Sequence, residues 1–316
     1  MIRFVRHLRI PRRRALLSVV ALGLVVLSAA GCGSGSSGSD SGSDGGTLRI
    51  GAIPDQDPEV LARNFGLVAD YLATELDVEV EYVPVTDYAA AVTLFRTGDV
   101  DLVWYGGLTG VQARLQTPGA EIVAQRDIDA EFRSVFVAHA DTGIEPVDDV
   151  EGLDVFADRR FTFGSESSTS GRLMPQYFLD QAGVGPDDFA GEPGFSGSHD
   201  RTAELVESGS YEAGVLNEQV WDDRVADGSV DPAQVVEVFR TPTYHDYHWL
   251  VHPDAVDRYG DGFAGDVGDA FTALSVDVAD QAEILELFGA EAFVPSEPAN
   301  YEEIEEIGRE LGLITD

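Results

Sequence analysis

Strand-like and helix-like segments alternate along this chain from Thr47 onward, and this alternation restricts the possible folds more than any other feature. Residues 47–54 read as a strand. Residues 57–76 repeat apolar side chains at the spacing of one helical face, after an Asp-Pro pair that is typical of a helix start. A short strand, a helix closed by Gly98 and a buried strand ending at two glycines follow. Strands that alternate with helices predict an open, mostly parallel α/β sheet.

A second unit of the same kind follows the first. It begins in the polar stretch 138–152 and contains predicted strands at 212–216 and 235–239. Residues 241–251 read as extended, and the remainder is predicted to be helical up to an amphipathic helix at the C-terminus. The sequence therefore predicts two α/β units.

Residues 1–31 have the pattern of a secretory leader. Six arginines precede an apolar stretch, 15–27, that is shorter than the roughly 20 residues needed to span a membrane. The segment "AAGC" then resembles a bacterial lipobox, although Ala29 stands where leucine is commonest. We expect Cys32, the only cysteine, to be the lipidated first residue of the mature chain rather than a buried core thiol. Residues 32–46 would form a Gly/Ser-rich tether.

The charge of the chain limits its direct partners. It has 57 acidic residues against 20 basic ones, all of them arginine, for a formal net charge of −37. Removing the leader would leave 14 arginines and a net charge of −43. Such an acidic surface argues against nucleic acids and anionic membrane surfaces as partners. The hydrophobic content of 44% is enough to build cores, so the acidity does not indicate disorder.

Three strand ends carry unusual residues, and ligands of open α/β sheets bind at such ends. These segments are "VWYGGLTG", "GSESSTSG" and "GFSGSHDRT". In the second of them, Ser168, Thr169 and Ser170 place hydroxyl groups where a helix begins. The unpaired N–H groups and the dipole of a helix start favour an oxyanion, so a strongly acidic protein could bind one without a cationic side chain. An ordinary serine cap is the alternative, but it would need only one hydroxyl.

Two other side chains are candidates for the same site. Ser198 can cap a helix whose first residues include His199, and an imidazole there could donate to an anion or be a satisfied polar surface group. Asp246 would repel an anion unless the ligand carries a proton or an amine that the carboxylate can accept. His245 and His248 would point apart on a strand, so we expect no metal site and no cofactor.

The serine-rich turns lack the patterns of a hydrolase. Neither contains a G-x-S-x-G elbow, and no serine, histidine and acid follow one another in the order of a catalytic triad. The chain has no lysine and hence no phosphate-binding P-loop. We therefore expect a binding protein rather than an enzyme. The alternatives are a phosphoryl or acyl ester hydrolase and a ligand-sensing lipoprotein.

Four segments together resemble the periplasmic phosphate/phosphite/phosphonate-binding proteins of ABC importers. They are "VDLVWYGG", "FTFGSESSTSGRLMP", "GSHD" and "TPTYHDYHW", and the likeness runs over nearly the whole mature chain. The resemblance implies a type II periplasmic binding protein, with two α/β lobes of mixed sheets joined by a two-segment hinge. Lobe 1 would comprise 47–137 and 244–316, and lobe 2 would comprise 138–243. It also implies an extracytoplasmic, lipid-anchored monomer that delivers a small oxyanion to a membrane permease and its ATPase.

The resemblance also implies which residues contact the ligand. By their match to the family's motifs, these are Ser168, Thr169, Ser170, Tyr88, Tyr105, His199 and Asp246. The family often has further contacts after the strand that matches "EAGVL", where Asn217 and Glu218 stand here. Residues 104–129 look closest to a subgroup labelled putative selenate importers. Selenate is fully ionised near neutral pH and has no proton for Asp246, so we expect phosphite or a small phosphonate to bind more tightly.

Overall fold

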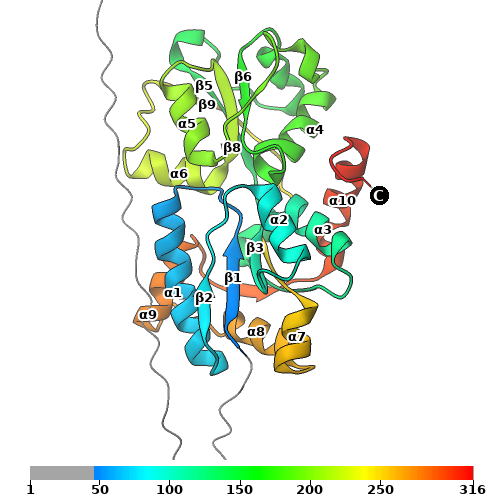
Figure 1. Ribbon diagram of the computed structural model, residues 1–316. Helices are drawn as coiled ribbons and strands as arrows, with labels where there is room; N and C mark the ends of the chain where they lie inside the picture. Colours follow the sequence, from blue (N-terminus) through cyan, green and yellow to red (C-terminus); the bar gives the residue numbers. More distant parts are fainter. Residues whose placement is uncertain (1–45, 316) are drawn as a thin grey trace, which may run out of the picture. The chain divides into compact units, whose positions relative to one another are not determined.

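The computed structural model describes residues 46–315 (Figure 1). The predicted leader, Cys32 and all but the last residue of the predicted tether lie outside the described residues. Within 46–315, none of the helices combines the length and the apolar character needed to cross a bilayer.

The first sheet has six strands in the order β11-β4-β10-β3-β1-β2. The strands β1, β2 and β3 pair in parallel, as the alternation of strands and helices predicts, whereas β10 and β11 join antiparallel. The sheet is therefore mixed. Its strands are β1 (Leu48–Ala52), β2 (Val80–Tyr82), β3 (Leu102–Tyr105), β4 (Glu121–Arg126), β10 (His248–Val251) and β11 (Phe293–Pro295).

The second sheet has five strands in the order β7-β6-β8-β5-β9. Here β6, β7 and β8 are parallel, and β5 runs antiparallel to both β8 and β9. The strands are β5 (Ser134–His139), β6 (Phe161–Phe163), β7 (Gly194–Phe195), β8 (Ala213–Asn217) and β9 (Val235–Arg240).

Two segments connect the sheets, 127–133 and 241–247. They pair with each other, since the backbones of Phe132 and Tyr244 exchange two hydrogen bonds of 3.0 Å. This confirms the predicted fold of two α/β units with mixed sheets and a two-segment connection. The whole of β5 pairs within the second sheet, so residues 134–137, which the sequence analysis placed in lobe 1, belong with the second sheet.

Helices pack around both sheets (Figure 1). The helix predicted at 57–76 is α1; Asp57 caps it by accepting a hydrogen bond from the Glu59 amide, and Pro58 occupies its first turn, where a missing N–H costs nothing. Its predicted apolar face, including Leu61 and Phe65, is buried. The helices are α1 (Pro58–Leu76), α2 (Tyr88–Arg96), α3 (Gly107–Gln116), α4 (Met174–Gln181), α5 (His199–Glu207), α6 (Glu218–Ala226), α7 (Pro253–Tyr259), α8 (Phe263–Thr272), α9 (Ala279–Leu287) and α10 (Glu302–Glu310).

The C-terminal part departs from the prediction of continuous helix. Residues Phe293–Pro295 form β11, which pairs with β4 at the edge of the first sheet. Proline is acceptable in an edge strand because one side of that strand has no hydrogen-bonding neighbour. Short 3₁₀ turns complete the chain at η1 (Asp127–Glu131), η2 (Ala140–Thr142), η3 (Val150–Phe156), η5 (Pro186–Asp188) and η6 (Pro298–Tyr301).

Candidate functional site

The three strand ends singled out in the sequence meet between the two sheets. The Leu108 amide at the start of α3 donates to Thr169 Oγ1 at 3.0 Å, and the His199 amide at the start of α5 donates to the Asp55 carbonyl at 2.9 Å. The buried Tyr88, at the start of α2, faces Ser168. Four helix starts, those of α2, α3, η4 (Thr169–Leu173) and α5, therefore converge on one buried cluster of side chains, and each contributes the positive end of its dipole.

The serine-rich segment forms a π-helical turn, η4 (Thr169–Leu173), that leads into α4. Ser168 Oγ accepts a hydrogen bond from the Gly171 amide at 2.9 Å. The Thr169 and Ser170 amides open the turn and have no partner among the described residues. Because the π turn comes first, Pro175 falls in the first turn of α4, as the sequence requires. Two buried N–H donors are thus available to an anion.

Glycine is required at position 171 by the crowding around the turn. A Cβ there would lie 2.9 Å from Ser168 Oγ, 3.1 Å from the Gly164 Cα and 3.2 Å from His199 Cε1. The same distances show that His199 stands directly beside the turn.

Asp246 is the acidic member of the cluster and is 1% exposed. Its Oδ1 accepts a hydrogen bond from the Gly107 amide at 2.9 Å, while its Oδ2 is buried without a partner. Burial raises the pKa of Asp246 to about 7, against the opposing effects of the Gly107 amide and of the Thr169 hydroxyl. A buried acceptor with a free oxygen calls for a proton from a bound molecule.

His199 is a neutral donor. Its Nδ1 accepts a hydrogen bond from the Asn217 amide at 3.2 Å, which places the ring proton on Nε2. Burial lowers its pKa to about 3, so the ring stays uncharged at neutral pH. The sequence alternative of a surface histidine is wrong, because the side chain is 1% exposed.

The two tyrosines that the resemblance places at the ligand, Tyr88 and Tyr105, differ in the partners of their hydroxyl groups. The Tyr88 hydroxyl is buried beside the Ser168 side chain, close enough to influence its pKa, but has no partner with hydrogen-bond geometry, so its proton is available to a ligand. The Tyr105 hydroxyl instead donates to the Ala91 carbonyl in α2 at 2.8 Å, and its ring packs against Phe95. Tyr105 therefore holds α2 against β3, and its proton is not directed at the cluster.

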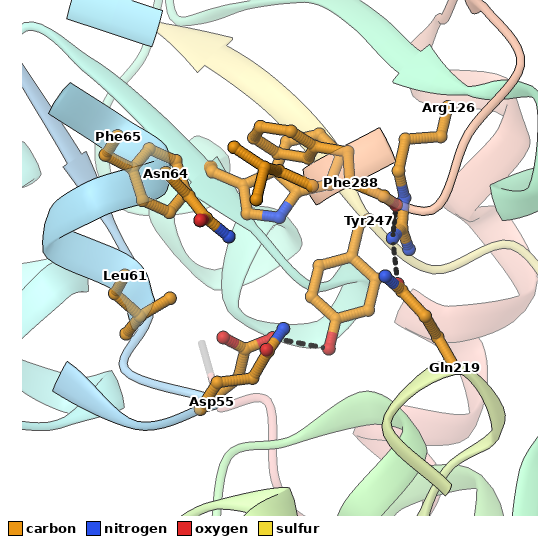
Figure 2. A pocket seen from close by; sticks show the side chains of 11 residues that line it. Asp55, Leu61, Asn64, Phe65, Arg126, Gln219, Tyr247 and Phe288 are labelled. Carbon is orange, nitrogen blue, oxygen red and sulfur yellow. Dashed lines mark hydrogen bonds between the residues drawn. The ribbon is translucent and has the colours of Figure 1, made fainter. Parts of the chain in front are cut away.

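Sequence reasoning missed Asp55 and Tyr247. The Tyr247 hydroxyl donates to Asp55 Oδ2 at 2.8 Å (Figure 2). It also accepts from Asn217 Nδ2 at 3.0 Å and lies 3.5 Å from His199 Nε2. Asn217, a possible ligand contact by resemblance, thus orients both Tyr247 and His199. The position of Asp55, just after the first strand of a parallel sheet, is the one signal that could have identified it.

The buried cation Arg126 is neutralised by Asp129. Arg126 donates to both carboxylate oxygens of Asp129, at 2.8 and 2.6 Å, and to the Phe288 carbonyl at 2.8 Å. Its guanidinium lies 4.8 Å from the centre of the Tyr247 ring, and it also donates to Gln219 in α6. Because Asp129 cancels the charge of Arg126, we assign the anion to amides, hydroxyls and the imidazole N–H. Arg172, in the same turn as Thr169 and Ser170, stacks 4.3 Å from the centre of the Phe163 ring and has a buried Nη1 without a partner.

Residues 46–315 contain no group of three or more His, Cys, Asp or Glu side chains placed so that they could hold a metal ion. His245 and His248 both lie near the Tyr301 ring, with ring centres 6.0 and 4.2 Å from it. They do not point apart as a regular strand would require, because β10 begins only at His248.

Comparison with known proteins identifies close relatives. A family model described as "ABC transporter, phosphonate, periplasmic substrate-binding protein" matches residues 50–301. The chain is 48% identical over 268 residues to the probable ABC transporter phosphite binding protein PhnD1 of Prochlorococcus marinus, covering 84% of this chain and 90% of the relative. It is 28% identical over 206 residues to the phosphate-import protein PhnD of Mycolicibacterium smegmatis, covering 62% of this chain and 63% of that protein.

Solved structures of such binding proteins resemble the chain as well. The structure of P. marinus PhnD1 in complex with methylphosphonate superposes with a TM-score of 0.84 at 48% identity, covering 86% of this chain and 100% of that one. A binding protein component of an ABC phosphonate transporter from Pseudomonas aeruginosa gives a TM-score of 0.72 at 19% identity, covering 83% and 85% of the two chains. The second likeness bears on the fold alone.

Proposed function

The chain belongs to the periplasmic substrate-binding proteins of phosphonate ABC transporters, and from that premise we propose that it captures a small, singly protonated tetrahedral oxyanion. Phosphite and small phosphonates are the ligands we favour. The ligand would lie between the two sheets, held by Ser168, Thr169, Ser170, Tyr88, His199 and Asp246. Tyr105 is not part of this proposed set.

The buried Oδ2 of Asp246 is the observation that carries the proposal. The other groups of the cluster that lack a partner among the described residues are donors: the Thr169 and Ser170 amides and the Tyr88 hydroxyl. The His199 Nε2–H, which lies 3.5 Å from the Tyr247 oxygen, is a further donor beside them. A ligand that matches several donors and one acceptor is an anion that retains one proton. The names of the relative, a phosphite binding protein, and of its structure, a complex with methylphosphonate, support the same ligand class.

Selenate is the second candidate, because residues 104–129 look like a subgroup given that label. It has the right shape but has no proton at neutral pH, so Asp246 would have to supply the shared proton itself. We expect phosphite and methylphosphonate to bind more tightly than selenate.

Isothermal titration of the purified chain with phosphite, methylphosphonate, phosphate and selenate tests the ranking. Micromolar binding of selenate with no heat from phosphite would overturn it. Assays with phosphoryl and acyl ester substrates test the enzyme alternative, and turnover abolished by Ser168→Ala would establish that alternative instead.

Replacing Tyr88 by phenylalanine should separate binding from folding. The Tyr88 hydroxyl is buried without a partner, so removing it should leave the free energy of unfolding unchanged or slightly higher. The same change removes a donor to the ligand and should weaken phosphite binding about tenfold. Calorimetry and denaturant unfolding measure the two effects. Equal phosphite affinity in variant and parent would exclude Tyr88 from the site.

The sheet memberships support lobes of 47–126 with 248–315 and of 134–240, with 127–133 and 241–247 as the hinge. We propose that these lobes close on the ligand and that the closed form is recognised by a membrane permease coupled to an ATPase. The protein would act as an extracytoplasmic monomer.

We further propose that Cys32 carries the lipid that anchors the protein, on the basis of the "AAGC" segment after the basic, apolar leader. Cys32→Ser should release the protein from the membrane fraction of expressing cells while phosphite affinity is unchanged. Continued membrane association of the serine variant after a high-salt wash would contradict lipid anchoring at this residue.

A further inference from the structure

Asp200, the second residue of α5, bonds to the start of a helix in the other lobe. Its Oδ2 accepts a hydrogen bond from the amide of Asp57, the N-cap of α1, at 2.8 Å. Its Oδ1 accepts from Arg224 Nη1 in α6, also at 2.8 Å, so both carboxylate oxygens have a fixed donor. The side chain of Asp200 is 20% exposed, so these bonds are partly shielded from water. Figure 1 shows the first turn of α1 against the lobe that carries α5 and α6.

The start of α1 needs an acceptor from outside the helix. In a capping box, the side chain of the third helical residue accepts a hydrogen bond from the amide of the N-cap residue. The third residue of α1 is Val60, whose side chain cannot accept one. Asp200 supplies the missing carboxylate from the other lobe, so the cap of α1 is complete only while the two lobes are together.

The neighbouring residue of α5 makes a second bond across the same gap. The His199 amide donates to the Asp55 carbonyl at 2.9 Å, so two consecutive residues of α5 bond to one loop of the first lobe. Neither the loop nor α5 belongs to the connecting segments 127–133 and 241–247. Opening of the lobes about those segments must therefore break both bonds.

From these contacts we propose that Asp200 is a closure latch, which bonds to the Asp57 amide when the lobes close and so slows release of the ligand. The proposal rests on the proposed function. A contact made only in the closed form stabilises that form and does not change the encounter of the ligand with the open form. Loss of the latch should therefore speed release and leave the association rate unchanged. Because Asp200 acts by holding the lobes together, it is a positioning residue.

The charge of Asp200 by itself predicts the opposite effect. Asp200 directly follows His199, a proposed ligand contact, and a carboxylate there repels an anion. If this repulsion were the only influence of Asp200, its removal would strengthen phosphite binding. Arg224 offsets most of the charge, so we expect the loss of the latch to dominate and binding to weaken. The direction of the change in phosphite affinity thus separates the two explanations.

Stopped-flow tryptophan fluorescence gives the association and release rates of phosphite, and calorimetry gives its dissociation constant. In Asp200→Ala, release should be about tenfold faster at an unchanged association rate, the effect of one hydrogen bond to a charged group. Asp254→Ala is the matched control. Asp254 is likewise the second residue of its helix, α7, but pairs with His252 of its own lobe, 3.7 Å away, so this variant should release phosphite at the parental rate.

Two variants at position 57 remove the other end of the bond. Asp57→Ala and Asp57→Pro both lose the side chain that caps α1, but only proline lacks the amide hydrogen that Asp200 accepts. The φ angle of Asp57 is −57°, which suits proline. Release should therefore be about tenfold faster from Asp57→Pro than from Asp57→Ala.

If Asp200→Ala does not fold, the two variants at position 57 decide. Release of phosphite from Asp200→Ala at the parental rate, tighter binding by that variant, or equal release from Asp57→Pro and Asp57→Ala would overturn the latch while leaving the proposed function intact. Absence of phosphite binding by the parent would instead overturn the proposed function, and the latch with it.

Discussion

Asp246→Asn is expected to reverse the anion preference of the protein, weakening phosphite at least about 100-fold and strengthening selenate about tenfold. The orientation of the new amide is fixed, because the Gly107 N–H donates to the oxygen at the Oδ1 position. The asparagine NH₂ must then occupy the place of the unpartnered Oδ2 and face the ligand. An N–H donor at this position cannot bind the P–OH group of phosphite, which is itself a donor, but it can bind a deprotonated oxygen of selenate. A buried pair of mismatched hydrogen-bonding groups costs much binding free energy, so the change should discriminate strongly between the two anions.

The pH dependence of selenate binding follows from the same carboxyl. The pKa of Asp246 is raised to about 7 by burial, so below that pH its protonated form can donate to a fully ionised anion. Selenate affinity of the parent should therefore rise as pH falls through 7, while that of Asp246→Asn should change much less. Burial also raises the pKa of Asp55 to about 6. Any pH dependence of selenate binding that remains in Asp246→Asn would therefore be attributed to Asp55 rather than to Asp246.

Calorimetry of parent and variant with both anions, at about pH 6 and pH 8, measures these effects. Denaturant unfolding of Asp246→Asn checks the fold, and the free energy of unfolding should not decrease, because a buried carboxyl is replaced by a neutral amide. Retention of the phosphite preference by a folded asparagine variant would refute the role given to Asp246.

Gly110→Ala should be the most destabilising of these substitutions, lowering the free energy of unfolding by about 3 kcal/mol. A Cβ at position 110 of α3 would lie 2.1 Å from His248 Nε2 and 3.3 Å from the Tyr105 Cβ. The His248 ring is fully buried and packs 4.2 Å from the Tyr301 ring, so it cannot move aside. Displacing α3 would also move the Gly107 amide away from Asp246, so phosphite affinity should fall as well.

Gly66→Ala provides the matched control. Gly66 also lies inside a helix, α1, but nothing stands within 4 Å of its added Cβ. Replacing this helical glycine should raise the free energy of unfolding by about 0.5 to 1 kcal/mol. Urea unfolding of both variants measures the difference, and equal stabilities would show that the close approach of α3 to β10 is not tight.

Local signals in the sequence predicted much of the fold. The Asp-Pro start of α1, the glycine that ends α2 and the serine cap of α5 all act within a few residues, and each lies where it was expected. β11 was missed because a three-residue edge strand with a proline has no distinctive pattern, and only its pairing with β4 makes it a strand.

The site was predictable where it depends on a helix start and not where it depends on distant contacts. The serine run at 168–170 identified a cluster of donors from its composition alone. The Asp55–Tyr247 bond joins residues 192 positions apart, and no local pattern specifies it. For Tyr105 the family motif gave the residue but not the direction of its hydroxyl, which bonds to α2, so its contact with the ligand stays an untested prediction.

A crystal structure of the protein with phosphite tests the central claim most directly. We predict that one anion oxygen accepts hydrogen bonds from the Thr169 and Ser170 amides and that the protonated oxygen lies about 2.6 Å from Asp246 Oδ2, with no arginine in contact. A phosphite bound at another place, or bound here chiefly by the guanidinium of Arg126 or Arg172, would contradict the account.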